Sequence, residues 1–539
     1  MRILKISQMK TNLKPYLAIL LIGMWWAAGC TKDFDKINTN PASYNQSNFD
    51  PNFLLTTAEV AYTGSYDFAY DTWRANLIYC SPMIQGFATV LSYWNGDKYT
   101  LSTGYTAAYW GFSGDGAYYE QLKPIVDIIQ STTDKPQYKN LHEVARIMRA
   151  LIMERITDLY GDCPYFDAGM GYYNKDYFPK YDKQQDIYND MLKEVEDAVS
   201  KLDPAADIPT GDVIYKGDIA AWQKFGNTLI LRMAMRMSKV DPETAKTWAQ
   251  KVVGKTMTSN ADNAFINGDP SGGLSTMNRN SLVLTGEGGQ EPYYVKWSDT
   301  FINWMKANDD PRLGTIAVTQ LYTDPSSAVQ NPNYDSNPAH QKGQPNGKDL
   351  SGIPGRDIST DPSYTSMPDY SSPSPFMIKQ DGPTFILTYG ESELLWADAA
   401  QRFGIGGSAA QHYHDGVKAA MTYLSQYDPA MTISEGAAEA YLTTHPYNPA
   451  QGLQMINTQY WALTNSMLDF YESWSNWRRT GYPELVPVDA PNNVTNGTIP
   501  RRFPYPLDES NVNPVHYKEA SDAVPGGDNL TGRVWWDSK

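Results

Sequence analysis

The residue types best suited to ligand chemistry lie in residues 92–110. This stretch combines aromatic rings with amide and carboxylate side chains: Tyr93, Trp94, Asn95, Asp97, Tyr99, Tyr105 and Trp110. Aromatic rings stack on the flat C–H faces of sugars, while amides and carboxylates hydrogen bond to sugar hydroxyls. The segment is therefore a candidate carbohydrate-binding loop, although any single ring can equally be a packing residue of that loop.

Familiar catalytic motifs are absent from the sequence. It contains no G-x-S-x-G, no H-E-x-x-H and no Walker A pattern. Of the six histidines, His412 and His414 are two positions apart on a predicted helix, so they point to different faces and make a poor metal pair. A glycosidase needs only two carboxylates roughly 5 to 10 Å apart. That possibility stays open, because acids from any part of the chain can meet.

The start of the chain predicts export and membrane anchoring. Four basic residues precede an uncharged run over 15–29, which is the order of a secretory signal and is short for a spanning helix. Small residues directly precede Cys30 in the sequence AAGC, which resembles the lipobox of bacterial lipoproteins. This resemblance implies cleavage after Gly29 and lipidation of Cys30, which anchors the protein to a membrane. An ordinary signal peptide with an incidental cysteine is the alternative.

Composition excludes nucleic acid as a partner. The formal net charge is −16, and loss of residues 1–29, which hold four positive and no negative side chains, makes it −20. Nucleic-acid binding requires basic patches, which so acidic a chain does not supply. Cys80 and Cys163 are expected to be free thiols or one disulfide, because their spacing is unlike that of zinc ligands.

Apolar residues recur at helical spacing in several blocks. Helices are predicted over 140–162, 184–204, 217–242, 241–254, 297–313, 389–404, 408–426 and 453–478. Asp218 is the expected N-cap of the third helix, and Gly161 is expected to end the first. Because helix, short turn and helix recur, the sequence predicts an all-α fold. Its scaffold consists of tetratricopeptide-like helical hairpins with long irregular loop insertions, although the spacing is not a strict period of about 34 residues.

The predicted organisation is a leader, a tether and a single domain. The expected boundaries are 1–29 for the signal peptide, 30–50 for the lipidated tether and 51–539 for the domain, with the helical scaffold mainly in 141–254 and 386–480 and the variable loops at about 92–120 and 255–385. Binding residues concentrate on long loops carried by a rigid scaffold. We therefore expect the ligand to contact these two loop regions.

Arg478 and Arg479 lie next to two tryptophans in SWSNWRRTGYP. In an acidic protein this arrangement predicts cation–π stacking and ion pairs, and an anion-binding arginine pair is the alternative. The proline-bounded stretch IPRRFPYP, residues 499–506, predicts a strap that packs the C-terminal segment onto the helices.

Six stretches occur in an informative order and spacing: TKDFDKINTNP (31–41), RITDLYGDCPYFDA (155–168), WQKFGNTLILRMAMRM (222–237), FILTYGESELLWADAAQRFG (385–404), FYESWSNWRRTGYPEL (470–485) and IPRRFPYPLDESNVNP (499–514). Together they resemble the SusD/RagB family of nutrient-binding outer-membrane lipoproteins of Bacteroidetes. The resemblance covers nearly the whole chain after Cys30.

The resemblance implies capture of a nutrient, with no enzymatic activity, metal or cofactor. Family members sit on a SusC-like TonB-dependent outer-membrane transporter, bind a glycan or in some cases a peptide, and pass it into the barrel. The polar, acidic segment after Cys30 resembles a signal for display on the cell surface. The expected localisation is therefore the outer membrane, lipid-anchored and surface-exposed. A peptide-binding member and, less favoured, a surface glycoside hydrolase are the alternatives.

Ligand sites of the family draw on the N-terminal region and on the irregular middle, without a fixed motif. The predicted contacts for an oligo- or polysaccharide are accordingly Trp94, Asn95 and Tyr99. Tyr293 and Tyr294, from the stretch EPYYVKW, are the predicted second contributors.

Overall fold

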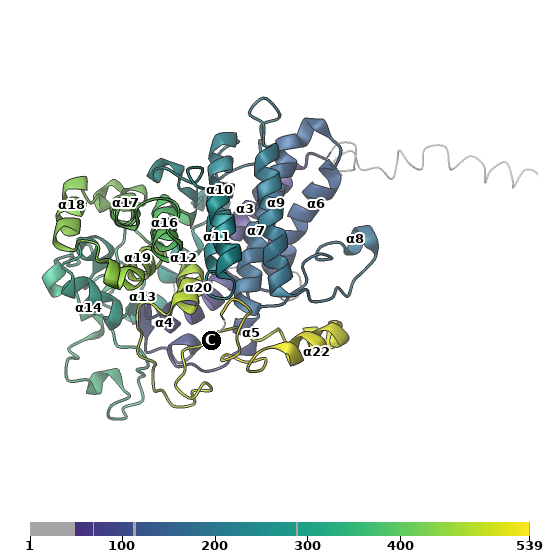
Figure 1. Cartoon of the computed structure of the whole chain (residues 1–539). Coiled ribbons are helices and arrows are strands. Elements are labelled where there is room, and N and C mark those ends of the chain that lie inside the picture. Colours follow the sequence, from purple (N-terminus) through teal and green to yellow (C-terminus); the bar gives the residue numbers. More distant parts are fainter. Residues whose placement is uncertain (1–48, 68, 112–114, 287–288, 538–539) are drawn as a thin grey trace, which may run out of the picture. The chain divides into compact units, whose positions relative to one another are not determined.

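A computed structural model describes residues 49–67, 69–111, 115–286 and 289–537. Residues from Pro51 onward belong to one unit that is built mainly from helices (Figure 1). Cys30 and the predicted leader and tether, up to residue 48, lie outside the described residues. Within the described ranges, no helix is long and apolar enough to cross a membrane.

Helices pack in consecutive pairs through the first half of the chain. They are α3 (Asn52–Tyr62), α6 (Lys123–Thr132), α7 (Lys139–Tyr160), α9 (Gln184–Lys201), α10 (Ile219–Arg236) and α11 (Pro242–Lys251). α6 packs on α7, α7 on α9, α9 on α10 and α10 on α11, side by side in Figure 1. Each helix turns its apolar stripe toward its neighbours. The predicted all-α fold with tetratricopeptide-like hairpins is confirmed.

Local signals set the ends of these helices as predicted. The side chain of Asp218 caps α10 by accepting a hydrogen bond from the backbone N–H of Ala221 at 3.1 Å. Gly161 follows α7 with a φ of 84°, a conformation that costs glycine little and other residues much. Asp218 thus starts α10 and Gly161 ends α7 through interactions with residues that are close in sequence.

A second group of helices forms the other half of the scaffold. It contains α16 (Tyr389–Phe403), α17 (Ala409–Thr422), α18 (Glu435–Thr444), α19 (Gly452–Ser466) and α20 (Phe470–Thr480). α16 packs on α17, α19 and α10, and α19 packs on α20. Thr388 and Glu391 form a capping box at the start of α16. Contact between α10 and α16 joins the two halves.

The predicted helix over 453–478 is wrong in one respect, because it is broken into α19 and α20. Leu468 adopts a φ of 58°, and the side chain of Asp469 caps α20 by accepting from the N–H of Glu472 at 3.2 Å. The amide of Asn76 donates to the carbonyl oxygen of Leu468 at 2.9 Å. The apolar periodicity continues across the break and therefore predicts one helix, whereas the Asp469 cap and the contact between Leu468 and Asn76 divide it.

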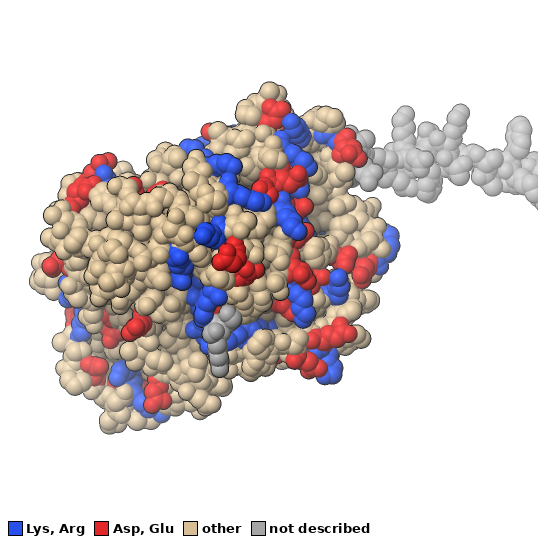
Figure 2. Space-filling model, in the orientation of Figure 1, with Lys and Arg blue, Asp and Glu red and all other residues tan. Residues whose placement is uncertain are grey.

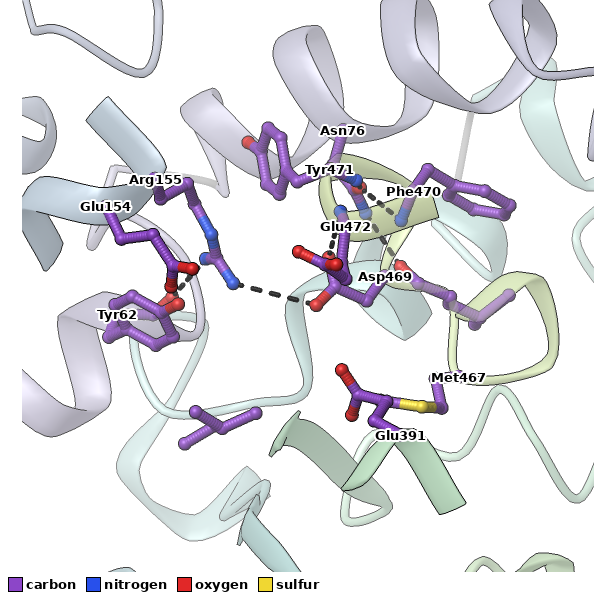
Figure 3. A network of polar contacts seen from close by, with 12 residues as sticks. Tyr62, Asn76, Glu154, Arg155, Glu391, Met467, Asp469, Phe470, Tyr471 and Glu472 are labelled. Atoms are coloured by element: carbon purple, nitrogen blue, oxygen red, sulfur yellow. Dashed lines mark hydrogen bonds and ion pairs between the residues drawn. The ribbon is translucent and has the colours of Figure 1, made fainter. Parts of the chain in front are cut away.

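Charged side chains are buried where α7, α10 and α20 meet. Nε of Arg232 donates to Oε2 of Glu154 at 3.1 Å. The half-buried Arg155 faces the buried Asp469, as Figure 3 shows, and 3.8 Å separates Nη2 from Oδ2. Removal of one partner of such a pair leaves an uncompensated buried charge, which costs about 3 to 5 kcal/mol. These pairs therefore constrain which helices come together.

Three short antiparallel ladders hold the irregular segments of the described chain. They pair β1 (Phe87–Thr89) with β3 (Val295–Trp297), β2 (Ala264–Asn267) with β6 (Pro383–Leu387), and β4 (Ala317–Val318) with β5 (Ser372–Pro373). Each ladder joins segments far apart in the sequence. The loops are thereby fastened to one another beside the helical scaffold.

Candidate ligand-binding site

The β1–β3 ladder brings the two predicted binding segments together. The strands are antiparallel, with Thr89 opposite Val295. Because they run in opposite directions, the residues that follow Thr89 and those that precede Val295 leave the ladder at the same end. Tyr93 and the short helix α13 (Glu291–Tyr294) meet at that end.

The carboxylate of Glu291 connects three segments of the chain. Its Oε1 accepts hydrogen bonds from Nε1 of Trp73 at 3.0 Å and from the hydroxyl of Tyr93 at 2.7 Å. Glu291 is 3% exposed, whereas both aromatic rings are only half-buried. Burial, followed by the charge of Glu291, raises the pKa of Tyr93, so this hydroxyl remains a hydrogen-bond donor.

The guanidinium of Arg74 lies among aromatic rings. Its Cζ is 3.7 Å from the ring centroid of Tyr70, 4.7 Å from that of Trp73 and 5.3 Å from that of Tyr105. This is cation–π geometry, which holds the cation without using its N–H groups. The buried Nε of Arg74 has no hydrogen-bond partner within the described ranges.

Tyr293 and Tyr294 continue the same surface. Their rings meet edge to face, with centroids 4.8 Å apart and an interplanar angle of 82°. Both are half-buried and pack, together with Tyr364, against a small apolar cluster separate from the main core. That cluster contains Val90, Ile358, Met367 and Tyr370. The loop around Tyr364 thus adds a third tyrosine to the pair that the sequence predicted.

The segment that carries Trp73 and Arg74 is fixed to the scaffold. Both residues lie in the first turn of η1 (Thr72–Cys80). Further along η1, Oδ1 of Asn76 accepts from the backbone N–H of Phe470 at 3.0 Å and of Tyr471 at 3.2 Å, which places Asn76 at the start of α20 (Figure 3). The aromatic residues of η1 are therefore carried by a rigid support.

Trp94 and Tyr99, two of the predicted contacts, are 0% exposed. The Tyr99 hydroxyl accepts from the backbone N–H of Val488 at 3.2 Å, and Gly96 lies so close to the backbone of Tyr79 that no side chain fits there. These contacts pull the loop inward. In place of the expected stacking role, Trp94 and Tyr99 thus have a packing role. The third, Asn95, is half-buried and donates to Oγ1 of Thr100 at 2.7 Å.

We call the half-buried rings and the two charged groups at this place the aromatic face; its members are Trp73, Arg74, Tyr93, Glu291, Tyr293, Tyr294 and Tyr364. It offers ring surfaces for stacking and polar edges for hydroxyl groups, as a sugar requires. Glu291 is buried and accepts hydrogen bonds from Trp73 and Tyr93, so it holds these two rings in place. Among the described residues, no group of three or more His, Cys, Asp or Glu side chains is placed to hold a metal ion.

Sequence reasoning missed Trp73, Arg74, Glu291 and Tyr364. The sequence analysis makes no prediction for the segment of Trp73 and Arg74, and Glu291 is one of many acids in the chain. Tyr364 lies in a stretch without periodicity. No spacing in the sequence indicates that these residues meet, because they come from three segments far apart in the chain.

Other predicted residues have structural partners. Nδ1 of His412 lies 2.6 Å from Glu393 Oε2, whereas Nε2 of His414 lies 2.9 Å from Glu439 Oε2, so the two histidines have different partners. The sequence left open whether Cys80 and Cys163 are free thiols or form a disulfide. In the structure both are free and buried.

The arginine pair behaves as the cation–π and ion-pair interpretation predicted. Cζ of Arg478 is 3.9 Å from the ring centroid of Trp474, and Nη1 of Arg479 is 2.9 Å from Oδ2 of Asp398. Both arginine side chains are buried. The predicted structural role is therefore confirmed.

Comparisons with known proteins agree on one family. Residues 43–506 match the SusD-like family described as "Starch-binding associating with outer membrane". A solved structure of a chitin-binding protein is 31% identical with a TM-score of 0.78, covering 91% of this chain and 100% of that one. A SusD-like structure from Bacteroidetes AC2a is 26% identical with a TM-score of 0.77, covering 91% and 100%. No protein of curated function matches the chain.

Proposed function

The chain belongs to the SusD-like family of starch-binding proteins that associate with the outer membrane, and on this premise we propose that it binds a nutrient glycan at the aromatic face. The bound glycan is delivered to a SusC-like TonB-dependent transporter. The protein acts by capture and release and carries out no catalysis.

The observation that supports this site is the shared acceptor Glu291. It holds Trp73 and Tyr93 by hydrogen bonds of 3.0 and 2.7 Å while leaving both rings partly exposed. Pre-organised rings lose little conformational freedom when a ligand stacks on them, so more of the stacking energy appears as affinity. A pyranose chain is the ligand class that uses both ring faces and adjacent polar edges.

Two glycan types are the first candidates for the ligand. The family description names starch, and the 31% identical relative is a chitin-binding protein. Both polymers consist of pyranose rings with an apolar C–H face, which suits Tyr293, Tyr294 and Tyr364. Chitin also carries acetamide groups, whose carbonyl oxygen can accept a hydrogen bond from Arg74.

The proposed site of action is the cell surface. The AAGC motif ending at Cys30 supports a lipid anchor, and the acidic segment that follows supports display outside the outer membrane. The anchor would hold the aromatic face close to a transporter in the same membrane.

Isothermal titration calorimetry of the purified protein with malto- and chito-oligosaccharides, and with peptide digests, tests the proposal. We expect saturable binding of one glycan type and an affinity at least about tenfold lower for Tyr294→Ala. Tyr172→Ala is the matched control, because Tyr172 is 69% exposed and lies outside the aromatic face. Binding of peptides alone would overturn the proposed ligand class, and unchanged glycan affinity in Tyr294→Ala would overturn the site.

A further inference from the structure

Arg74 is the one arginine of the described chain that donates no hydrogen bond and forms no ion pair. Every other arginine within the described ranges donates at least one hydrogen bond. Arg478, which also lies over an aromatic ring, donates to the carbonyl oxygen of Asp158 at 2.7 Å. The unused donors therefore distinguish Arg74 from the arginines that hold the scaffold together.

Basic side chains of this acidic protein ordinarily have acidic neighbours. Nζ of Lys251 on α11 is 3.0 Å from Oε2 of Glu196 on α9. Figure 2 shows Lys and Arg side chains beside Asp and Glu side chains on the face of the molecule that carries these two helices. Arg74 has no such neighbour within 4.0 Å among the described residues, although the net charge of the chain is −16.

The guanidinium of Arg74 is accessible at its outer end. The residue is half-buried, and so are the three aromatic rings around it. Nε is enclosed, whereas neither Nη1 nor Nη2 is, although no described residue accepts a hydrogen bond from them. Beside the ring of Tyr105 the surface is open, because a side chain added at Gly104 would meet nothing within 4 Å. Both Nη groups can therefore meet a ligand at the surface.

The surroundings of Arg74 suit an anionic group. Cation–π contacts orient the planar fork of N–H donors before a ligand arrives, so that little freedom is lost on binding. The carboxylate of Glu291 does not neutralise this cation, because its Oε1 accepts from Trp73 and Tyr93. A carboxylate takes two parallel hydrogen bonds from such a fork, and these charge-assisted bonds are stronger than neutral ones.

We propose that Arg74 binds a carboxylate of the glycan, so that the ligand of the aromatic face contains an acidic sugar of the uronic acid type. Because Nε is enclosed, the carboxylate approaches end-on and bridges Nη1 and Nη2. This inference rests on the proposed function and narrows its ligand class. The neighbouring sugar rings stack on Trp73 and Tyr93, as in the neutral case.

Neutral glycans satisfy the same place less well. A hydroxyl group of starch or the acetamide of chitin supplies a neutral acceptor, which leaves the charge of Arg74 without a counter-ion. The net charge of −16 repels an anionic ligand from the protein as a whole. Arg74 is therefore the residue that determines specificity for a carboxylated sugar.

Calorimetric titration with matched pairs of oligosaccharides tests the inference. The probes are maltohexaose and chitohexaose, each compared with its C6-oxidised form, which carries carboxylates in place of primary hydroxyl groups. In the pair that binds, we expect the oxidised member to bind about tenfold or more tightly at low salt. The ratio of the two affinities should fall in high salt, because screening weakens an accessible charge pair.

Variants of Arg74 assign this ratio to its guanidinium. Arg74→Gln should bring the ratio to about one, and Arg74→Lys should restore it only in part, because an ammonium group lacks the planar fork. Lys251→Gln is the matched control, because it also removes one positive charge but lies on α11, outside the aromatic face. It should keep the wild-type ratio. Thermal melting of each variant checks that the fold is retained.

The outcomes separate this inference from the proposed function. Equal affinity for the neutral and oxidised members, with binding still weakened by Tyr294→Ala, would overturn the acidic sugar and leave the proposed function standing. A ratio that persists in Arg74→Gln would overturn the assignment to Arg74. No binding of any of the four oligosaccharides would overturn both proposals.

Discussion

Nε1 of Trp73 donates a hydrogen bond to Oε1 of Glu291 at 3.0 Å across 218 positions of sequence. The bond fixes an indole from η1 against a carboxylate from α13, and the hydroxyl of Tyr93 shares the same oxygen. A single buried acceptor therefore holds two rings of the aromatic face in place.

Glu291→Ala should lower glycan affinity by about tenfold or more. The substitution leaves Trp73 and Tyr93 without their common acceptor, so both rings gain freedom that binding must then remove. Glu291→Gln keeps an acceptor oxygen and should lose less. Calorimetry of both variants measures the effect, with Glu435→Ala as control because that side chain is 78% exposed. Wild-type affinity in Glu291→Ala would rule out the supporting role.

Lys296→Met should raise the free energy of unfolding by a few kcal/mol at or below pH 7. Burial lowers the pKa of Lys296 from 10.5 to about 7, and its Nζ donates to Oγ of Ser372 at 2.8 Å. Between pH 7 and 10.5 the unfolded chain holds a proton that the folded chain does not. Wild-type stability is therefore penalised fully below pH 7, and the penalty fades as pH rises to 10.5.

Chemical denaturation across this pH range checks the prediction for Lys296. The advantage of Lys296→Met over the wild type should shrink as pH rises from 7 toward 10.5. Lys193→Met, at an exposed position, is the control and should show no such trend. A constant difference between variant and wild type would contradict the assignment to this ammonium group.

Glu391→Gln should remove a loss of folding stability that the wild type shows as the pH rises. Burial, opposed by Arg232 and assisted by Glu472 and Asp469, raises the pKa of Glu391 from 4.5 to about 8; Figure 3 places it near these two acids. The folded chain therefore holds a proton that the unfolded chain releases between pH 4.5 and 8. The stability from this group is complete below pH 4.5 and is lost as pH rises through 8.

Denaturation curves for Glu391→Gln and the wild type should nearly coincide at pH 4.5. The variant should become more stable by a few kcal/mol above pH 8, because glutamine never has to release a proton. It can keep the acceptor for the N–H of Thr388, which Glu391 binds at 2.8 Å. A difference that does not grow with pH would exclude the raised pKa as its cause.

Cys80 and Cys163 should not react with a thiol reagent in the folded protein. Both are free and buried, and burial raises the pKa of each thiol. A reagent therefore cannot reach the sulfur atoms, and the reactive thiolate form is not populated. In a Cys30→Ser chain, Ellman's reagent should detect no thiol before unfolding and both thiols in concentrated guanidinium chloride. Detection of neither thiol after unfolding would indicate a disulfide.

The sequence by itself determined α7, α9, α10, α11, α16 and α17, the helix ends at Asp218 and Gly161, and the family, whereas α3, α6 and α18 were not predicted. The stripes of α7 and α10 and the cap at Asp218 depend on positions within one or two turns, so local patterns are enough to predict them. The order of motifs such as RITDLYGDCPYFDA identified the family correctly. The arginine pair and the strap were also predictable, because tryptophan and proline neighbours limit what such residues can do. In the strap, the backbone N–H of Phe503 donates to the carbonyl oxygen of Leu159 on α7 at 3.0 Å.

Tertiary structure alone decided which aromatic rings are buried and which reach the surface. Trp94 and Tyr99 have suitable ring types, but contacts with Tyr79 and Val488 turn their loop inward. The break at Leu468 and the bond between Trp73 and Glu291 likewise depend on residues far apart in the chain. Helix periodicity records short-range geometry, whereas the exposure of a side chain depends on which distant segment covers it.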